Sequence, residues 1–156
     1  LPPSLEVVVS ERTPEVVLAA ERTYLAAGDG VILAEVAATA RRDLPRVALR
    51  GGRHAPGDRI PDEVVPRALA LWRILAEFAA PRGERLQEIR PERDGTFTVQ
   101  TQRGVLLRVR GEDAERQLGR LAAALRHAGA SLHAYEAVDL RFGDRVVLRV
   151  GTQKGG

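Results

Sequence analysis

Tight-turn signals between short runs of strand-forming residues restrict this chain to folds built on antiparallel hairpins. Asp94-Gly95 and Arg103-Gly104 separate three such runs, Gly143-Asp144 separates the last two, and Gly28-Asp29-Gly30 divides a pair near the start. Glycine adopts the positive φ of a two-residue turn at little cost. Links this short favour antiparallel pairing between consecutive strands.

Two segments show helical spacing instead. The first extends from Asp62, a predicted N-cap, to Pro81, with Pro66 tolerated near its first turn. The second begins near Asp113 and ends at Gly129. The order from residue 62 is helix, three strands, helix, two strands, which predicts an α+β fold. We expect a mainly antiparallel β-sheet with both helices packed on one face and an open C-terminal edge strand.

The front of the chain predicts a strand meander followed by a loop-rich segment. Leu5–Ser10 is rich in β-branched residues and is predicted to be a strand, and a second run starts at Val16. Residues 34–61 carry several prolines and glycines, with one short predicted strand at Val47–Leu49.

Composition indicates a folded protein and removes several kinds of chemistry. Of the residues, 44% are hydrophobic and 29% charged, and cysteine is absent. Disulfides, thiol catalysis and thiolate metal sites are therefore excluded. No run approaches the roughly 20 apolar residues of a membrane span. The formal charge is only +3, and no basic run alternates with stacking aromatics. We expect no cofactor, no metal and no nucleic acid, although an arginine-rich nucleic-acid module stays open as an alternative.

Three histidines supply the other alternative, a small hydrolase or metal-binding enzyme. His54 lies in the loop-rich segment, His127 at the end of a helix, and His133 beside the last hairpin. The enzyme hypothesis requires His54 or His133 to meet acidic residues in a pocket. His127 has a structural explanation, because a helix C-terminus stabilises a cation. No serine stands in a nucleophile elbow and no phosphate-binding glycine loop is present.

The last hairpin is the strongest candidate for function. Its second strand, Arg145–Val150, has almost no chain after it that could pair along its outer side. The unpaired N–H and C=O groups of such an edge are a template for a partner's strand. Phe142 stands at the hairpin corner, and arginines nearby could orient an acidic partner. The predicted partner-binding residues are Phe142, Arg145, Val146, Val147, Leu148, Arg149 and Val150, together with Arg90 and Arg93.

Four motifs, in order along the chain, give it a family resemblance. They are the strand ending in Glu11-Arg12-Thr13-Pro14, the hairpin Ala27-Gly28-Asp29-Gly30, the step Leu44-Pro45, and Asp139-Leu140-Arg141-Phe142 before the last strand. With these the chain resembles the bacterial cell-division family FtsQ/DivIB. The resemblance implies a non-enzymatic divisome scaffold that binds the FtsB/FtsL coiled-coil pair through its last strand. Arg90 or Arg93 matches a basic contact of the family.

The resemblance also implies a domain layout and a location. Residues 1–13 would be the last strand of a truncated POTRA domain, 14–150 the β domain, and 151–156 a flexible tail. The parent protein would be a single-pass protein of the inner membrane, with this domain on the extracytoplasmic side and concentrated at the division septum. Its membrane anchor would lie outside this chain. Weak self-association is left open.

Overall fold

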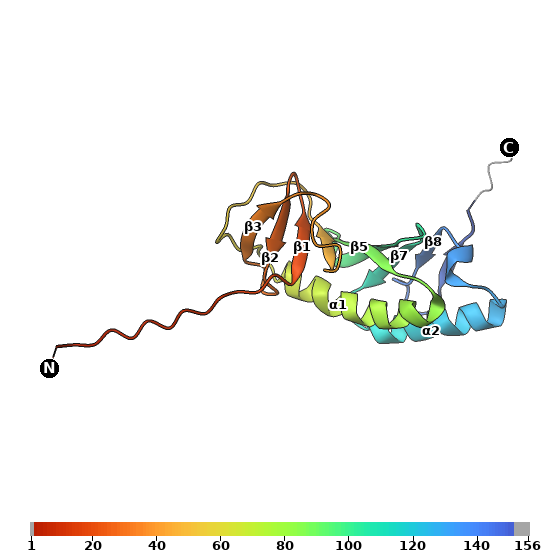
Figure 1. Ribbon diagram of the computed structural model, residues 1–156. Coiled ribbons are helices and arrows are strands. Elements are labelled where there is room, and N and C mark those ends of the chain that lie inside the picture. Colours follow the sequence, from red (N-terminus) through yellow and green to blue (C-terminus); the bar gives the residue numbers. More distant parts are fainter. Residues whose placement is uncertain (1, 152–156) are drawn as a thin grey trace.

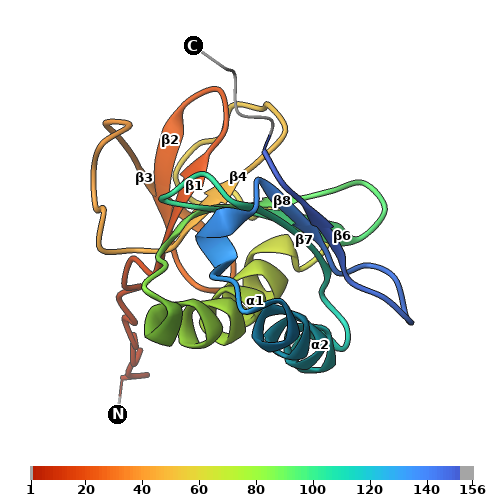
Figure 2. The same ribbon diagram turned by 90° about the vertical axis from the view of Figure 1, so that its right-hand side faces the viewer.

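A single mixed sheet with two helices on one face forms the body of the protein. The computed structural model describes residues 2–151, and within them nine strands follow the order β3-β2-β1-β4-β5-β6-β7-β8-β9. Both helices lie side by side beneath this sheet (Figures 1 and 2). The strands are β1 Val16–Ala19, β2 Thr23–Ala26, β3 Ile32–Val36, β4 Arg46–Ala48, β5 Leu86–Pro91, β6 Thr96–Thr101, β7 Leu106–Arg110, β8 Ala137–Asp139 and β9 Val147–Arg149.

The predicted α+β class and the mainly antiparallel sheet are confirmed. Every strand pair joined by a short turn is antiparallel: β1–β2, β2–β3, β5–β6, β6–β7 and β8–β9. Three further pairs are parallel, because in each the connection returns the chain to the end at which the first strand began. These are β1–β4, β4–β5 and β7–β8. The helices α1 (Val64–Ala79) and α2 (Ala114–Ala128) form two of these crossovers.

Alternation along the strands divides the sheet into an apolar face and a polar face. On β6, Phe97 and Val99 are buried, whereas Thr96, Thr98 and Gln100 are only partly buried. The buried set meets the apolar stripe of each helix, as the period-two and period-3.6 patterns predict. From α1 the core receives Val65, Leu69 and Leu75, and from α2 it receives Leu118, Leu121 and Leu125. Neither α1 nor α2 lies on the opposite face of the sheet (Figure 2).

The helix ends partly confirm the predicted boundaries. The predicted Asp62 N-cap is wrong, because Glu63 precedes α1 in left-handed backbone and no side chain caps the helix. Pro66 lies in the first turn, where its missing N–H is tolerated. Gly129 ends α2 as predicted, with φ +60° and its N–H donated to the Arg126 carbonyl. A glycine in this conformation is a common way to stop a helix.

The predicted strand at Leu5–Ser10 is wrong. No residue from 2 to 13 belongs to a strand or helix, and the segment extends away from the sheet in Figure 1. β-branched residues favour extended backbone, but a strand exists only where a neighbouring strand accepts its hydrogen bonds. We call residues 2–13 the N-terminal arm. Most of the predicted tail 151–156 lies outside the described residues.

The loop-rich segment agrees with expectation: after the end of β3 at Val36, the short β4 is its one strand, close to the predicted Val47–Leu49. Trp72 of α1 is partly buried and packs against the core. In the described part of the chain, no helix is both long enough and apolar enough to cross a membrane.

Candidate partner-binding edge

The last strand, β9, lies at one end of the sheet and pairs only with β8 among the described residues. The register places Asp139 opposite Val147, Val138 opposite Leu148, and Ala137 opposite Arg149. No other strand of residues 2–151 covers the outer side of β9. The open C-terminal edge expected from the sequence is therefore present.

The hydrogen bonds of β8 reveal which β9 backbone groups face outward. Leu106 N–H donates to Glu136 O and Leu140 N–H to Arg108 O, so the C=O of Glu136 and the N–H of Leu140 face β7. Backbone direction alternates along a strand, so Ala137 and Asp139 turn their groups toward β9. The register sets them opposite Arg149 and Val147, and Glu136 N–H, just before β8, donates to Arg149 O at 2.8 Å. The N–H and C=O of Leu148 therefore point away from the sheet.

The side chains of this edge alternate between core contact and solvent. Val146 and Leu148 pack against the hydrophobic core. Val147 is 41% exposed, Val150 67% and Phe142 36%. Exposed large apolar side chains beside an unpaired strand are unusual, since they invite association. The edge thus offers apolar contact as well as hydrogen bonds.

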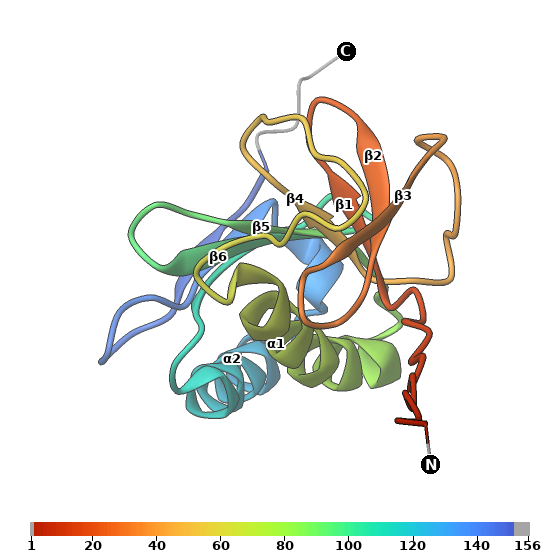
Figure 3. The same cartoon turned by 90° about the vertical axis from the view of Figure 1, so that its left-hand side faces the viewer.

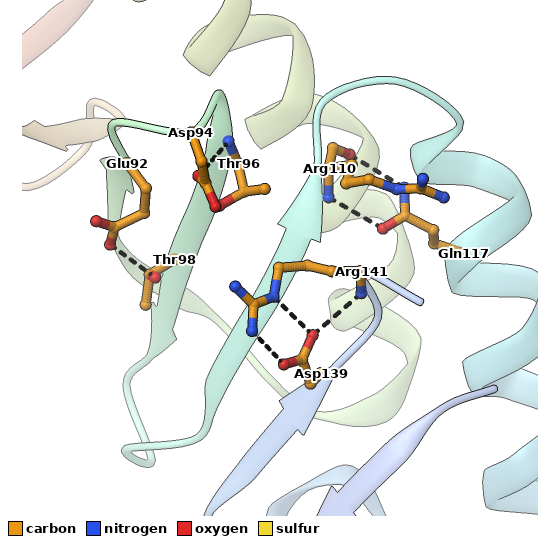
Figure 4. Close-up of polar contacts among 8 residues, drawn as sticks. All are labelled: Glu92, Asp94, Thr96, Thr98, Arg110, Gln117, Asp139 and Arg141. Carbon is orange, nitrogen blue, oxygen red and sulfur yellow. Dashed lines mark hydrogen bonds and ion pairs between the residues drawn. The ribbon is translucent and has the colours of Figure 1, made fainter. Parts of the chain in front are cut away.

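The corner before β9 is built by the four residues Asp139–Phe142. Leu140 is fully buried, whereas Asp139 and Arg141 form a clasp on the opposite face of the sheet (Figure 4). Arg141 donates to the Asp139 carboxylate from Nε at 2.9 Å and from Nη2 at 2.7 Å. This contact, opposed by partial desolvation, holds the pKa of Asp139 below its usual value. With its neighbours fixed on both faces, Phe142 is held outward at the corner.

The side chain of Arg145 lies over the aromatic ring of Phe142. The Arg145 guanidinium carbon lies 4.6 Å from the ring centroid. Arginine over an aromatic face is attracted by the ring quadrupole. The sequence predicts these two residues as separate contacts, and the structure brings them together as one amphipathic unit beside β9.

Arg90 and Arg93 occupy different places. Arg90 is exposed on β5 and contacts Glu88 at 3.4 Å. Arg93 follows β5 and lines a hollow of about 400 Å³ on the sheet, together with Arg108 and Arg141. The structure therefore brings Arg93, and not Arg90, next to the corner that precedes β9. Arg108 was missed as a site residue, although its position opposite Asp139 follows once β7 and β8 are parallel neighbours.

Threonine contacts shape the wall of this hollow (Figure 4). Asp94 accepts hydrogen bonds from the hydroxyl and the backbone N–H of Thr96, at 2.6 and 3.0 Å. These bonds hold the pKa of Asp94 below its ordinary value. Asp94 therefore stays anionic and balances part of the arginine charge around it.

The histidines do not gather into one centre. His54 packs edge-on against Tyr24, with ring centroids 5.5 Å apart. His127 lies in the last turn of α2, where the helix dipole explains it. No group of three or more histidine, cysteine or acidic residues in the described chain is arranged to hold a metal ion.

His133 does meet an acidic residue, as the enzyme hypothesis required. Its Nδ1 lies 3.6 Å from Oε1 of the buried Glu84, and Arg103 Nη1 lies 3.0 Å from the same ring nitrogen. Arg103 also approaches the Glu84 carboxylate at 4.0 Å. The cluster ties the β6–β7 turn to the segment before β8. A buried carboxylate with an arginine and a histidine nearby has a structural explanation of its own, because a buried charge needs polar neighbours.

Many arginines on the surface are already paired with acidic residues, which argues against a nucleic-acid interface. Examples lie across the sheet, such as Arg46 with Glu88 at 3.4 Å and Arg22 with Glu35 at 2.7 Å. A phosphate-binding surface needs cations that are free to neutralise phosphates. At these positions the arginines balance local carboxylates.

These features define a class: an α+β domain with both helices on one face of a mixed sheet and, among residues 2–151, an uncovered edge strand at its end. The C-terminal model of the cell division protein family FtsQ/DivIB matches residues 16–141. The chain therefore belongs to the FtsQ/DivIB family, as its four motifs indicated, and has a role in cell division. None of the curated proteins compared with the chain matches it.

Proposed function

We propose that this chain is the β domain of a non-enzymatic divisome scaffold that binds an FtsB/FtsL-type partner along β9. One observation carries the proposal: a family member ends its described sheet in a strand whose outer backbone groups and apolar side chains are uncovered. Strand addition there would give the partner backbone hydrogen bonds and side-chain contacts at once.

The partner strand would bond to the outward N–H and C=O of Leu148 and of the residues two positions away. The exposed side chains of Val147 and Val150 would contact apolar side chains of the partner. Phe142 with Arg145 would bind the part of the partner next to its paired strand. These contacts lie within one continuous surface, so a short peptide could reach all of them.

Charge would set the orientation of the partner. Arg145 and Arg149 flank β9, and Arg93 lines the hollow beside the corner. An acidic segment would be drawn to this side, and rim charges of this kind act mainly on association rate and register. Arg90 is a weaker candidate, because it contacts Glu88.

The proposal also covers the domain boundaries and the cellular location of the protein. Residues 14–150 would form the β domain, and the parent protein would hold it on the extracytoplasmic side of the inner membrane at the division septum. The domain would help regulate septum formation by assembling partners and not by catalysis. Support comes from family membership and from histidines that lie in separate structural surroundings.

Amide hydrogen exchange of β9 tests the proposal. We expect a peptide from the FtsB homologue of the same organism to slow exchange at Leu148, whose N–H faces outward, more than at Val147, whose N–H already faces β8. A scrambled peptide of equal charge is the control for non-specific attraction. Binding with unchanged Leu148 exchange would move the site elsewhere, and no binding would reject the proposal.

A matched pair of variants sharpens this test. Arg149→Glu reverses an exposed charge beside β9, whereas Arg116→Glu makes the same change on the exposed surface of α2. We expect the first variant to weaken peptide binding at least about tenfold and the second to leave it within about twofold. Equal effects would show that net charge, and not the β9 edge, governs binding.

A further inference from the structure

A large hollow lies at the end of the sheet where β4 and β5 begin. Its volume is about 760 Å³, and it is enclosed by the β3–β4 connection, the starts of β4 and β5, and Trp72 of α1. Ligand pockets usually have volumes of about 300–1,000 Å³. We call it the Trp72 hollow. All of its lining residues lie between positions 17 and 102, so its shape does not depend on either end of the chain.

The Trp72 hollow exists because β4 and β5 separate toward their starts. The two strands pair at one position, Val47 with Ile89, whereas β1 and β4 pair at three. Two residues earlier β4 would need Pro45 as the partner of β5. Proline has no N–H to donate, and the Pro45 carbonyl already accepts from Val17 N–H of β1 at 2.9 Å. The ladder therefore stops, and space remains between the two strands.

The β3–β4 connection forms a fixed rim around this space. Arg46 Nη1 donates to the Ala38 carbonyl at 3.1 Å, which holds the connection against the sheet. Arg41 has φ +49°, a left-handed conformation that is unfavourable for a residue with a side chain, and it donates twice to the Asp43 carboxylate, each time at 2.9 Å. Backbone held in such a conformation is concentrated at ligand-binding sites. The rim is thus formed before any ligand arrives.

Two arginines of the Trp72 hollow have no carboxylate partner among residues 2–151. Arg42 follows Arg41 on the rim, Arg85 stands just before β5, and both are exposed. The other two arginines of the lining pair with Asp43 and Glu88. Four arginines and two carboxylates line the hollow, so a net charge of +2 remains on Arg42 and Arg85.

Trp72 supplies an apolar surface beside these cations. It is partly buried against the core and lines the hollow together with Leu44 and Pro45. Tryptophan buries a large apolar area on contact, and guanidinium groups bind carboxylates through paired hydrogen bonds. This combination suits an acidic peptide that carries an apolar side chain. A nucleic acid suits it less well, because closely spaced phosphates would meet the two carboxylates of the lining.

We propose that the Trp72 hollow is a second docking site, which binds an acidic peptide segment of another protein. Carboxylates of that segment pair with Arg42 and Arg85, and an apolar side chain between them contacts Trp72. The hollow and the β9 edge are separate, because four strand intervals, about 19 Å at ~4.8 Å each, lie between β5 and β9. Both can be occupied at once, so the domain holds two partners together.

Selection from a random peptide display library, with the whole chain as bait, tests the proposal. Peptides that bind the wild type are kept only if they fail to bind a variant with Arg42→Glu and Arg85→Glu together. Both residues are exposed, so the core is unaltered, which circular dichroism checks. We expect the kept peptides to carry acidic residues around one large apolar residue. No kept peptide, or kept peptides without this pattern, would overturn the proposal.

Trp72 is the one tryptophan of the chain, so its fluorescence reports on the hollow directly. We expect a kept peptide to shift the emission to shorter wavelength, because its apolar side chain displaces water from the indole ring. Arg42→Glu and Arg85→Glu should each weaken this titration at least about fivefold. Arg116→Glu, the same change on the exposed surface of α2, is the matched control and should stay within about twofold. Unchanged emission at saturating peptide would overturn the proposal.

The result is distinguishable from failure of partner binding at β9. The double variant leaves β9 unaltered, so it should bind the FtsB-type peptide as the wild type does. That peptide should also leave Trp72 emission unchanged, and a shift would show that the two sites are not separate and overturn the second site. Binding of the acidic peptide alone rejects only the proposed β9 partner, and binding of the FtsB-type peptide alone rejects only the second docking site.

Discussion

The two ends of the sheet treat their open sides in opposite ways. At β3 the chain covers the start of its own edge: Ile32 N–H donates to Asp58 O at 2.8 Å, and Gly57 N–H donates to Ile32 O at 2.9 Å. A bridge between Val31 and Arg59 extends this cover. Figure 3 shows β3 and its connecting loops at that end. At β9, no segment of residues 2–151 plays the same part.

The side chains follow the same division. The exposed residue of β3 is Glu35, which pairs with Arg22, whereas exposed residues of the β9 end include Val147 and Val150. Charges and covering loops are common ways to prevent strand addition, and apolar residues favour it. Among residues 2–151 the sheet therefore has one edge that is partly covered and charged, and one that is uncovered and apolar, which is why we propose partner binding at the second.

The largest effect should come from proline at β9, where position decides the outcome. Val147→Pro removes an N–H that faces β8 and should lower the free energy of unfolding by about 2 kcal/mol. Val150→Pro lies outside β9, on an exposed side chain, and should leave stability nearly unchanged. Thermal and urea unfolding of both variants measures the difference. Equal loss of stability would mean that the outward and inward backbone groups are assigned wrongly.

Uncovering the opposite edge should have a somewhat smaller effect. Gly57 has φ +95° and its N–H bonds to Ile32, so Gly57→Ala forces a side chain into a left-handed conformation that costs about 1 to 2 kcal/mol. Faster amide exchange at Ile32 would report the loosened cover. Gly143→Ala is a suitable control, since Gly143 does not have positive φ and open space surrounds its Cα. If Ile32 exchange stayed slow, the loop would not be the cover we describe.

Removing the clasp beside β9 should cost about 1 kcal/mol. Asp139→Asn abolishes the charge that Arg141 binds. Because the pKa of Asp139 is lowered in the folded state, its contribution is present above the ordinary carboxyl pKa near ~4 and is lost as pH falls through the lowered value. The wild type should therefore lose stability on acidification more than the variant does. Parallel acid dependence would assign no stabilising role to the clasp.

The smallest effect should come from the charged pair at β3. Glu35→Ala removes the partner of Arg22 on an exposed surface, where ion pairs contribute little and salt screens them. We expect no measurable change in thermal stability at physiological salt. A large loss would indicate that the pair, and not the covering loop, protects the β3 edge.

Much of the fold was predictable because local chemistry decides it. Glycine turns such as Asp94-Gly95 placed the hairpins, and the spacing of Leu118, Leu121 and Leu125 alone marked the buried face of α2. The wrong predictions are also instructive. Asp62 had the right residue type for a cap but lies in left-handed backbone, and Leu5–Ser10 had the composition of a strand without a neighbour.

The candidate site was predictable only in part. The apolar run 146–150 and the corner Asp139–Phe142 could be recognised from their order in the chain. The position of Arg93 beside Arg108 and Arg141 could not, because it depends on strands that are neighbours in space and distant in sequence. The contact of Glu84 with His133 was hidden for the same reason.

The sequence by itself determined most of the strands, turns and helices, because side-chain periodicity and backbone preference act over a few residues. It also determined family membership, through motifs whose order is kept. Only the tertiary structure decided which edge is covered. A loop from residues 57–59 folds back on β3, and nothing equivalent in residues 2–151 reaches β9. Backbone hydrogen bonds are chemically the same at every residue, so their partners are chosen by where the chain brings them together.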